Sequence, residues 1–467
     1  MKIVFIIPEY LSGRSFLQPP VDILVVSEIL EQDGWKTYLI DNRIEKLTLT
    51  KLIKKIEKIT PNVLLVTTSP YDVSQNYFID FRIYVTEKTI YELKKHFKNI
   101  PLIVVGSHGT VREDILLKDT RYSPDIIIKW EYEIILCKVL EILKKFNFNI
   151  RKAKIMLKKL PNLVIIDKKN NKYENTRYSS KLAHPLNFPI VPNIKLIKKY
   201  KHNYFGDKYI NGKHMKVNKW GVVLFQRGCP FHCAFCFKLF GKSVRLVNKE
   251  NKILESVSRW VEFGYNNLFV LDYTFGLSRN HLQIYQKLSK EFPEVNFYLQ
   301  TRADLITKRN INEYKKININ FIWVGIESFS NCIQKIISKY NSVRQIISAI
   351  KLLEKNEISY GGFIQFGLPG ETIKTINKNL YYIWKLKIPY TKSIILHTPL
   401  YGTRTYSWAK KQYPWIGKNW SDISTIRGLV QNDMTPGILL KLVDFLRSRE
   451  IFEYSNPPQI DKILNDT

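Results

Sequence analysis

Short apolar runs alternate with amphipathic stretches throughout the first 150 residues. Lys2–Ile7 is apolar after its first residue, whereas Val21–Gln32 repeats apolar residues at helical spacing and Leu47–Ile59 has the pattern of a basic amphipathic helix. The other short β-rich runs are Thr37–Ile40, Val63–Thr67, Leu102–Val105 and Asp125–Ile128. This alternation predicts an α/β domain with a doubly wound, Rossmann-like parallel sheet, in which ligands bind at the carboxyl ends of strands.

A second series of the same kind begins at Trp220. Helical stretches such as Val343–Lys355 and Lys374–Lys385 separate six short apolar runs. The predicted strands are Gly221–Gln226, Asn267–Leu271, Asn296–Gln300, Phe321–Val324, Gly361–Phe366 and Ser393–His397. Six β/α units predict a partial (β/α)6 barrel of the TIM type, with its chemistry at the C-terminal ends of the strands.

The region between the two series is strongly basic. Residues 151–219 hold 18 Lys and Arg against 3 Asp and Glu, and Leu163–Asp167 with Lys172–Tyr178 predicts a hairpin. This region is either a solvated linker or a docking surface for an anionic partner. We therefore expect four parts: an N-terminal domain (1–150), a basic connector (151–218), a barrel (219–404) and a C-terminal tail (405–467).

Composition narrows the class of protein. The chain has 467 residues and a formal net charge of +32, and no apolar run reaches the roughly 18 residues that a membrane helix needs. Five cysteines, three of them within eight residues, exclude a disulfide scaffold and favour a reducing, cytoplasmic compartment. The charge suits an anionic partner, but no RNA-binding module accompanies it, so we do not expect a nucleic-acid partner.

The three clustered cysteines carry the strongest chemical signal. Cys229, Cys233 and Cys236 have the spacing C-x3-C-x2-C in the segment RGCPFHCAFC. Three thiolates in one short loop suit three irons of a [4Fe–4S] cluster and leave the fourth iron open to a ligand. Zinc is the rival interpretation, because His232 offers a fourth ligand; however, a structural zinc site usually draws on a second, separate pair of ligands.

Further motifs follow at the ends of the predicted barrel strands, and together with the cysteine segment they resemble the radical S-adenosylmethionine (SAM) superfamily. They are LDYTF (Leu271–Phe275), TRADLI (Thr301–Ile306), GIES (Gly325–Ser328), GLPGET (Gly367–Thr372) and PLYGT (Pro399–Thr403). The resemblance covers about residues 219–405 and is greatest to the branch that has an N-terminal cobalamin-binding domain.

The resemblance implies a set of cofactor-binding residues. Cys229, Cys233 and Cys236 would bind the cluster, and Phe235 would position the adenine of SAM. The other residues implied to lie near SAM are Asp272, Arg302, Glu327, Ser328, Gly367 and Gly370. A structural ion pair, a helix cap or a tight turn remains the alternative interpretation for these residues, and the family often has paired acids where this chain has Asp272-Tyr273.

The N-terminal domain resembles the cobalamin-binding fold of the same branch. The segments Pro19–Asp22, VVGSHGT (Val104–Thr110) and Ile126–Glu133 match its elements. The residues implied to lie near cobalamin are Pro20, Asp41, Ser69, Gly106, Ser107 and His108. Ser107 and Trp130 replace glycines of the family pattern, and larger side chains would narrow a crevice for a corrin ring.

The resemblance implies a cobalamin-dependent radical SAM methyltransferase acting on a small natural-product or peptide substrate, with a donor such as flavodoxin or ferredoxin supplying electrons. A radical SAM rearrangement, cyclisation or oxidation without methyl transfer is the alternative, and a non-catalytic iron–sulfur or cobalamin protein is a more distant one. We interpret Cys137 and Cys332 as core residues, with a radical-site thiol as the alternative for Cys332. Aromatic residues of the tail either cover the barrel mouth or pack against it: Tyr406, Trp408, Tyr413, Trp415 and Trp420.

Overall fold

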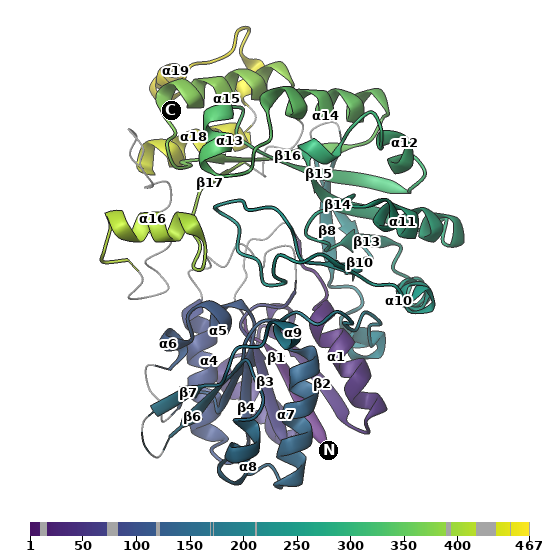
Figure 1. Cartoon of the computed structure of the whole chain (residues 1–467), viewed down its shortest axis with the longest axis vertical. Coiled ribbons are helices and arrows are strands. Elements are labelled where there is room, and N and C mark those ends of the chain that lie inside the picture. The colour runs from purple at the N-terminus through teal and green to yellow at the C-terminus, as the bar shows by residue number, and fades with distance from the viewer. Residues whose placement is uncertain are drawn as a thin grey trace. The chain divides into compact units, whose positions relative to one another are not determined.

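The chain forms two compact units in a computed structural model (Figure 1). Unit 1 contains Met1–Tyr204 and Lys238–Gly264, and unit 2 contains Phe205–Phe237 and Tyr265–Thr467. No helix in the described ranges is long and apolar enough to cross a membrane. The structure describes residues 1–9, 16–71, 83–117, 122–168, 170, 172–210, 213–388, 394–416, 436–448 and 450–466.

Unit 1 is built on a seven-stranded sheet in the order β2-β1-β3-β4-β5-β6-β7. The first five strands pair in parallel, and β6 and β7 add an antiparallel hairpin at one edge. The order of the parallel strands is that of a doubly wound fold with its switch point between β1 and β3. The strands are β1 (Lys2–Ile7), β2 (Lys36–Asp41), β3 (Val63–Thr67), β4 (Leu102–Val105), β5 (Ile126–Ile128), β6 (Leu163–Asp167) and β7 (Lys172–Asn175).

Helices cover both faces of this sheet, as its sequence requires. All residues of β1 from Ile3 to Ile7 are fully buried, so the alternating side chains of this strand meet apolar partners on both sides. On one face, Val4 and Leu64 share a core with Leu52 and Leu93 from two helices. The helices of unit 1 are α1 (Val21–Gln32), α2 (Asn42–Glu45), α3 (Leu49–Ile59), α4 (Ile83–His96), α5 (Ser107–Val111), α6 (Glu113–Leu116), α7 (Glu133–Lys145), α8 (Ile150–Leu157), α9 (Ser180–Ala183), the 3-10 segment η2 (Ile194–Tyr200) and α10 (Glu250–Glu262); the short strand β12 (Arg245–Leu246) also lies in unit 1.

Unit 2 contains a six-stranded, all-parallel sheet in the order β10-β13-β14-β15-β16-β17, the arrangement of a partial barrel. Sequential strands are neighbours, so their carboxyl ends form one continuous edge. The strands are β10 (Trp220–Val223), β13 (Asn267–Val270), β14 (Asn296–Arg302), β15 (Ile319–Glu327), β16 (Tyr360–Phe366) and β17 (Ile394–Leu396).

The remaining elements of unit 2 connect or flank this sheet. Ser342 and Thr372 form capping boxes that begin the two long helices before and after β16. The helices are α11 (Arg279–Glu291), α12 (Ile311–Tyr314), α13 (Asn331–Ile336), α14 (Val343–Lys355), α15 (Ile373–Lys385), α16 (Arg404–Gln412), α18 (Pro436–Ser448) and α19 (Ile460–Asp466), with 3-10 segments η3 (Ala303–Leu305) and η4 (Glu450–Glu453). The additional strands are β8 (Phe205–Ile210), β9 (Lys213–Asn218) and β11 (Gln226–Arg227).

The predicted α/β fold class is confirmed, with a Rossmann-like sheet followed by a partial barrel. The hairpin expected in the connector exists, and it pairs with β5 and so belongs to the N-terminal sheet. A second antiparallel hairpin, β8–β9, was not predicted. The strand predicted over Gly221–Gln226 is interrupted, because β10 ends at Val223.

The structure corrects the interpretation of Cys332, whose side chain is exposed on α13 and not part of a core. Cys137 on α7 is partly buried. In the tail, Tyr406 and Tyr413 pack against a small apolar cluster within unit 2, whereas Trp415 remains 46% exposed. Trp420 lies outside the described residues.

Candidate cofactor sites

The cysteine loop follows β10 and β11 in unit 2 and has no regular secondary structure between residues 228 and 237. Gly228 adopts φ 85°, a conformation that a side chain would strain, so this glycine allows the sharp turn into the loop. The Ala234 amide donates to the Ile337 carbonyl at 2.8 Å, and the Arg404 guanidinium donates to the His232 carbonyl at 2.6 Å. The loop is therefore anchored to two other segments of its own unit.

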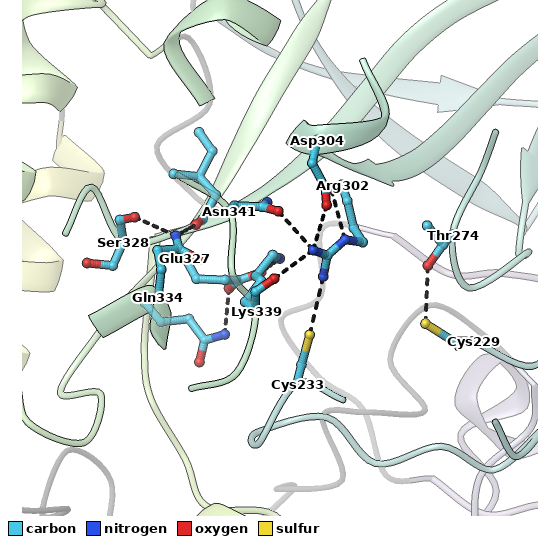
Figure 2. A network of polar contacts seen from close by, with 12 residues as sticks. Cys229, Cys233, Thr274, Arg302, Asp304, Glu327, Ser328, Gln334, Lys339 and Asn341 are labelled. Carbon is cyan, nitrogen blue, oxygen red and sulfur yellow. Dashed lines mark hydrogen bonds and ion pairs between the residues drawn. The ribbon is translucent and has the colours of Figure 1, made fainter. Parts of the chain in front are cut away.

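The sulfur atoms of Cys229 and Cys233 have different surroundings. Cys229 Sγ lies 3.4 Å from Thr274 Oγ1, and Cys233 Sγ lies 3.6 Å from an Arg302 nitrogen (Figure 2). Within the described ranges, no three His, Cys, Asp or Glu side chains converge on one point suitable for a single metal ion. A [4Fe–4S] cluster places each thiolate on a different iron, so three separate thiols in one loop are the donor set that it needs.

Burial and the nearby cations have opposite effects on the pKa of the Cys233 thiol. Burial raises the pKa of its thiol, whereas the nearby Lys339 and Arg302 cations lower it. Lys339 and Arg302 thus favour the thiolate, the form that binds iron. Both cations also contact aromatic rings of the cysteine loop: Arg302 lies 3.7 Å from the Phe231 ring centre, and Lys339 lies 5.8 Å from that of Phe235.

Arg302, at the end of β14, connects the cysteine loop with the barrel (Figure 2). Its guanidinium makes two bonds to Asp304, of 2.9 and 2.8 Å, and donates to the Lys339 carbonyl at 2.7 Å and to Asn341 Oδ1 at 2.9 Å. Its remaining terminal nitrogen faces Cys233. A planar guanidinium held in this way is fixed in orientation, which suits the positioning of a neighbouring anionic group.

Glu327 ends β15 in a strained conformation. Its φ is 64°, and the pairing of β15 with β16 shifts register between Gly325 and Glu327. The carboxylate pairs with Lys339 Nζ at 2.6 Å and accepts from Gln365 Nε2 at 2.6 Å, and both charged side chains are nearly buried. A Cβ on Gly325 would stand 2.6 Å from Lys339 Nζ, so glycine there makes room for the lysine. Left-handed backbone at a non-glycine residue often marks a functional site.

Asp272 is the most fully satisfied acid at this edge. Its Oδ1 accepts the backbone N–H groups of Phe225 and Gln226 at 2.8 and 2.9 Å, and its Oδ2 lies 2.7 Å from His281 Nε2 and 2.9 Å from the Tyr285 hydroxyl. The carboxylate is completely buried. This arrangement favours the structural alternative for Asp272, because the side chain fixes the strand that leads into the cysteine loop.

The loop after β16 is bound to the end of β15 through one residue of α15. Asn379 Oδ1 accepts from the Phe329 amide at 2.6 Å and from the Ser328 hydroxyl at 3.2 Å, while its amide nitrogen donates to Glu371 at 3.1 Å. Glu371 in turn accepts the Gly367 amide at 2.5 Å. Burial raises the pKa of Glu371 to about 8. Ser328 and Gly367 are thereby held in one bonded unit.

Two further candidates lie beside this loop. Gly370 has φ 77°, and a Cβ there would meet Ile336 at 2.6 Å, so this turn admits only glycine without rearrangement. The Phe235 ring packs against the apolar cluster of Ile333, Ile337 and Leu368. Phe235 is therefore fixed beside the GLPGET loop, and its role in positioning adenine stays a prediction.

In unit 1, the residues implied to lie near cobalamin include Ser69, Gly106 and Ser107, where β3 and β4 end. The Ser107 amide donates to Ser69 Oγ at 3.1 Å, and Gly106 adopts φ 107°. A Cβ on Gly106 would stand 2.5 Å from Thr68 Oγ1 and 2.9 Å from the Ser69 amide. Small side chains thus bring two strand ends together in a surface of hydroxyl and backbone groups.

His108 and Trp130 border the same edge. His108 is buried in the short helix α5, and Trp130 follows β5 with φ 67°. The Trp130 amide donates to Thr110 Oγ1 at 2.9 Å, which links the ends of β4 and β5. Trp130 adopts a left-handed conformation, which glycine adopts readily, at the position where the family pattern has glycine.

Two other candidates of unit 1 have internal roles. Asp41 is completely buried, bonds Arg43 at 2.8 and 2.6 Å, and accepts from the Tyr204 hydroxyl at 3.0 Å. Pro20 precedes the first residue of α1, where a proline ring is compatible with helix entry. Asp41 is therefore bonded within unit 1, and Pro20 stands at the entry of α1.

A buried acidic group adjoins Pro20 in the sequence. Burial raises the pKa of Asp22 to about 7, and the Tyr132 hydroxyl donates to it at 3.0 Å. Tyr132 in turn packs edge-on against Tyr71. This group lies among residues near the carboxyl ends of the sheet and was not among the predicted site residues.

Several residues of the unit 2 site were missed in the sequence. They are Lys339, Asn341, Gln365, Asn379 and His397, which lie outside or between the quoted motifs. Gln365 carries a visible signal as a polar residue within an apolar strand, and His397 carries one as the last residue of the predicted strand Ser393–His397. Contact between Lys339 and Glu327 depends on the path of the chain after α13, which local patterns do not specify.

Fold and site together define a class: a partial barrel with a three-cysteine loop at its carboxyl edge, joined to a doubly wound domain. Residues 223–380 match the model of the Radical SAM superfamily, so the chain carries a radical SAM domain. This match confirms the recognition made from the cysteine segment and the later motifs.

Known proteins extend the likeness to both units. The "uncharacterized methyltransferase PH0819" of Pyrococcus horikoshii is 24% identical over 434 residues, covering 91% of this chain and 87% of that protein. The structure of the cobalamin-dependent SAM radical enzyme OxsB, with aqua-cobalamin and SAM bound, has a TM-score of 0.72 at 13% identity over 99% of this chain and 70% of its own. The radical SAM methyltransferase TsrM from Kitasatospora setae, with cobalamin and a [4Fe-4S] cluster bound, has a TM-score of 0.65 at 14% identity over 87% and 75% of the two chains. The structural likenesses agree with the fold class expected from the sequence.

Proposed function

We propose that this protein is a radical SAM enzyme that uses a [4Fe–4S] cluster, SAM and cobalamin to methylate an unactivated carbon of a small natural-product or peptide substrate. The observation that carries the proposal is the arrangement of Cys233, Arg302, Lys339 and Glu327 in one bonded network beside the three-cysteine loop. The methyl-transfer part is further supported by a methyltransferase-named relative and by the TsrM fold.

When bound, the cluster supplies the low-potential electron that cleaves SAM, and cobalamin supplies the methyl group. Cys229, Cys233 and Cys236 hold the cluster in this proposal. Arg302 and Lys339 compensate the negative charge of the thiolates, and the phenyl ring of Phe235 provides an apolar face for adenine.

In this proposal Glu327, which accepts from Lys339 and Gln365, lies near the ribose and the methionyl end of SAM. Its pairing with the Lys339 ammonium at 2.6 Å compensates the charge of the carboxylate in a nearly buried position. Since hydrogen bonds fix the side chains of this network, the protein contributes mainly orientation and exclusion of water.

Unit 1 provides the cobalamin site in this proposal. Gly106, Ser107 and Ser69 form a surface of hydroxyl and backbone groups on which a corrin ring and its amide side chains would rest. Electrons would come from a flavodoxin or ferredoxin, since the strongly basic chain suits an acidic electron donor.

The test uses the full-length protein reconstituted with iron and sulfide and with hydroxocobalamin. We expect corrin absorbance at near-stoichiometric level after desalting, and formation of 5′-deoxyadenosine from SAM under dithionite. Incubation with substrate-containing extract and methyl-deuterated SAM should release 5′-deoxyadenosine and S-adenosylhomocysteine together with a deuteromethylated product.

Other outcomes distinguish the alternatives. Production of 5′-deoxyadenosine and a modified product without corrin binding and without a deuterated methyl group would favour a rearrangement, cyclisation or oxidation. Ser107 and Trp130, which depart from the family pattern, are the observations that favour this second candidate. Absence of SAM cleavage by the fully reconstituted protein would overturn the enzymatic proposal.

A further inference from the structure

A chain of polar side chains crosses the carboxyl edge of the barrel from β15 to the residue after β17. Lys339 Nζ bonds Glu327 at 2.6 Å, Glu327 accepts from Gln365 Nε2 at 2.6 Å, and Gln365 Oε1 lies 2.9 Å from His397 Nδ1. His397 follows β17 directly, and its amide donates to the Phe366 carbonyl at 2.7 Å. This series of bonded side chains therefore ends beside the turn that contains Gly367.

The order of donors and acceptors along this chain determines the state of His397. The Glu327 carboxylate is paired with Lys339 and accepts from the amide nitrogen of Gln365, which therefore faces it. The carbonyl oxygen of Gln365 then faces the imidazole, and His397 Nδ1 must carry the proton. In a neutral ring, Nε2 is consequently an acceptor with a free lone pair.

Burial keeps the ring neutral. His397 is 1% exposed, and desolvation lowers its pKa to about 3. Within the described part of the chain, Nε2 has no hydrogen-bond partner. A buried acceptor without a donor costs free energy. A ligand that donates a hydrogen bond to Nε2 when it binds would remove this cost.

We infer that His397 Nε2 accepts a hydrogen bond from the adenosine part of SAM, either from a ribose hydroxyl or from the 6-amino group of adenine. The inference rests on the proposed function. His397 adjoins the Gly367 turn, whose following residue Leu368 supports the Phe235 ring, so an adenosine group on Phe235 would lie on the same edge. The hydrogen-bonded side chains of Glu327, Gln365 and His397 then fix the imidazole tautomer that SAM requires.

Two substitutions separate the acceptor from the rest of the ring. His397→Asn keeps a polar group at the position of Nδ1 for Gln365 but removes Nε2, whereas His397→Gln places an amide oxygen near the position of Nε2. We expect the dissociation constant of SAM, measured by calorimetry on the reconstituted enzyme, to rise about tenfold in His397→Asn. In His397→Gln the dissociation constant should return most of the way to the wild-type value. Thermal unfolding of both variants checks that they remain folded.

The donor is identified with three SAM analogues, which lack the 2′-hydroxyl, the 3′-hydroxyl or the N–H groups of the 6-amino group. The analogue without the donor that faces His397 should bind wild type and His397→Asn equally, whereas the other two should still discriminate between them. Equal SAM affinity of the wild-type protein and folded His397→Asn would overturn this inference and leave the proposed function standing. A wild-type protein that neither binds nor cleaves SAM would overturn both.

Discussion

The carboxyl edges of the two sheets differ in the side chains that they carry, which are charged in unit 2 and uncharged in unit 1. In unit 2, charged side chains from two strand ends, Arg302 and Glu327, bond the segment after α13 through Lys339 (Figure 2). In unit 1, the edge at Ser69, Gly106 and Ser107 is uncharged, and the charged pair Asp41–Arg43 is directed into the protein.

The difference follows from the ligands proposed for each edge. A small, charged molecule such as SAM is oriented by fixed charges, and their desolvation is compensated by the network. A large and nearly flat corrin ring needs close approach of backbone and small side chains over a broad area. The two edges therefore should respond to different substitutions, and the following variants test that separation.

Loss of a cluster cysteine should have the largest effect. Cys229→Ala, Cys233→Ala or Cys236→Ala removes a thiolate for which the loop has no substitute, so we expect iron content to fall and 5′-deoxyadenosine formation to reach background. Cys332→Ala is the matched control, because this side chain is exposed on α13, and it should retain iron and SAM cleavage. Retained SAM cleavage in any of the three variants would contradict the ligand assignment. Corrin binding by unit 1 should persist throughout.

The second largest effect should follow from Lys339→Met. Lys339 and Glu327 are a nearly buried pair, and removing one partner leaves an uncompensated charge that costs about 3–5 kcal/mol of stability. We expect lower unfolding stability and weaker SAM binding. The double variant Lys339→Met/Glu327→Gln should recover much of the stability but not the SAM affinity, and exposed Lys335→Met serves as control. Recovery of SAM affinity in the double variant would show that the pair is purely structural.

Gly106→Ala should have a smaller effect, and it should change corrin binding by unit 1 rather than SAM cleavage by unit 2. The added Cβ would collide with Thr68 Oγ1 and the Ser69 amide, which forces the β3 and β4 ends apart. Corrin affinity, measured by absorbance titration, should fall at least about tenfold. SAM cleavage without substrate should change little. Gly34→Ala, at a similar φ of 80° but in open space, controls for backbone strain, and equal corrin affinity of both variants would contradict the crevice assignment.

The fold was largely predictable because its signals are local. Buried parallel strands appear as short apolar runs, and the predicted bounds of Lys2–Ile7 and Val63–Thr67 agree with β1 and β3. The hairpin β8–β9 was missed although the dipeptide Asn211-Gly212 lies between its strands, because Lys and His interrupt the apolar alternation.

The candidate sites were predictable only where a residue sits in a strand-end motif. The contact of Arg302 with Asn341 joins residues 39 positions apart, and that of Glu327 with Gln365 spans 38. Such pairs depend on how strands align across the sheet and on the reach of long side chains. Likewise, the sequence marks Asp272 as a strand-end acid but not that four donors from its own unit occupy it.

The smallest predicted effect concerns pH and stability in unit 1. Asp22 is completely buried, and its folded-state pKa of about 7 exceeds the ordinary value of 3.8. The folded protein therefore binds this proton more tightly than the unfolded chain, so the contribution of Asp22 to stability falls as pH rises from about 4 to about 7. Asp22→Asn removes this dependence, since an amide does not titrate in this range.

We expect the unfolding free energy of Asp22→Asn, relative to wild type, to rise between pH 5 and pH 8 by on the order of 1–3 kcal/mol. Glu371, whose pKa burial raises to about 8, contributes the same slope to both proteins and cancels in the difference. Denaturant titrations at four pH values measure it. A constant difference across the range would mean that Asp22 is ionised in the folded protein. Unit 1 would then also hold a buried charge near its carboxyl edge, which would weaken the contrast with unit 2.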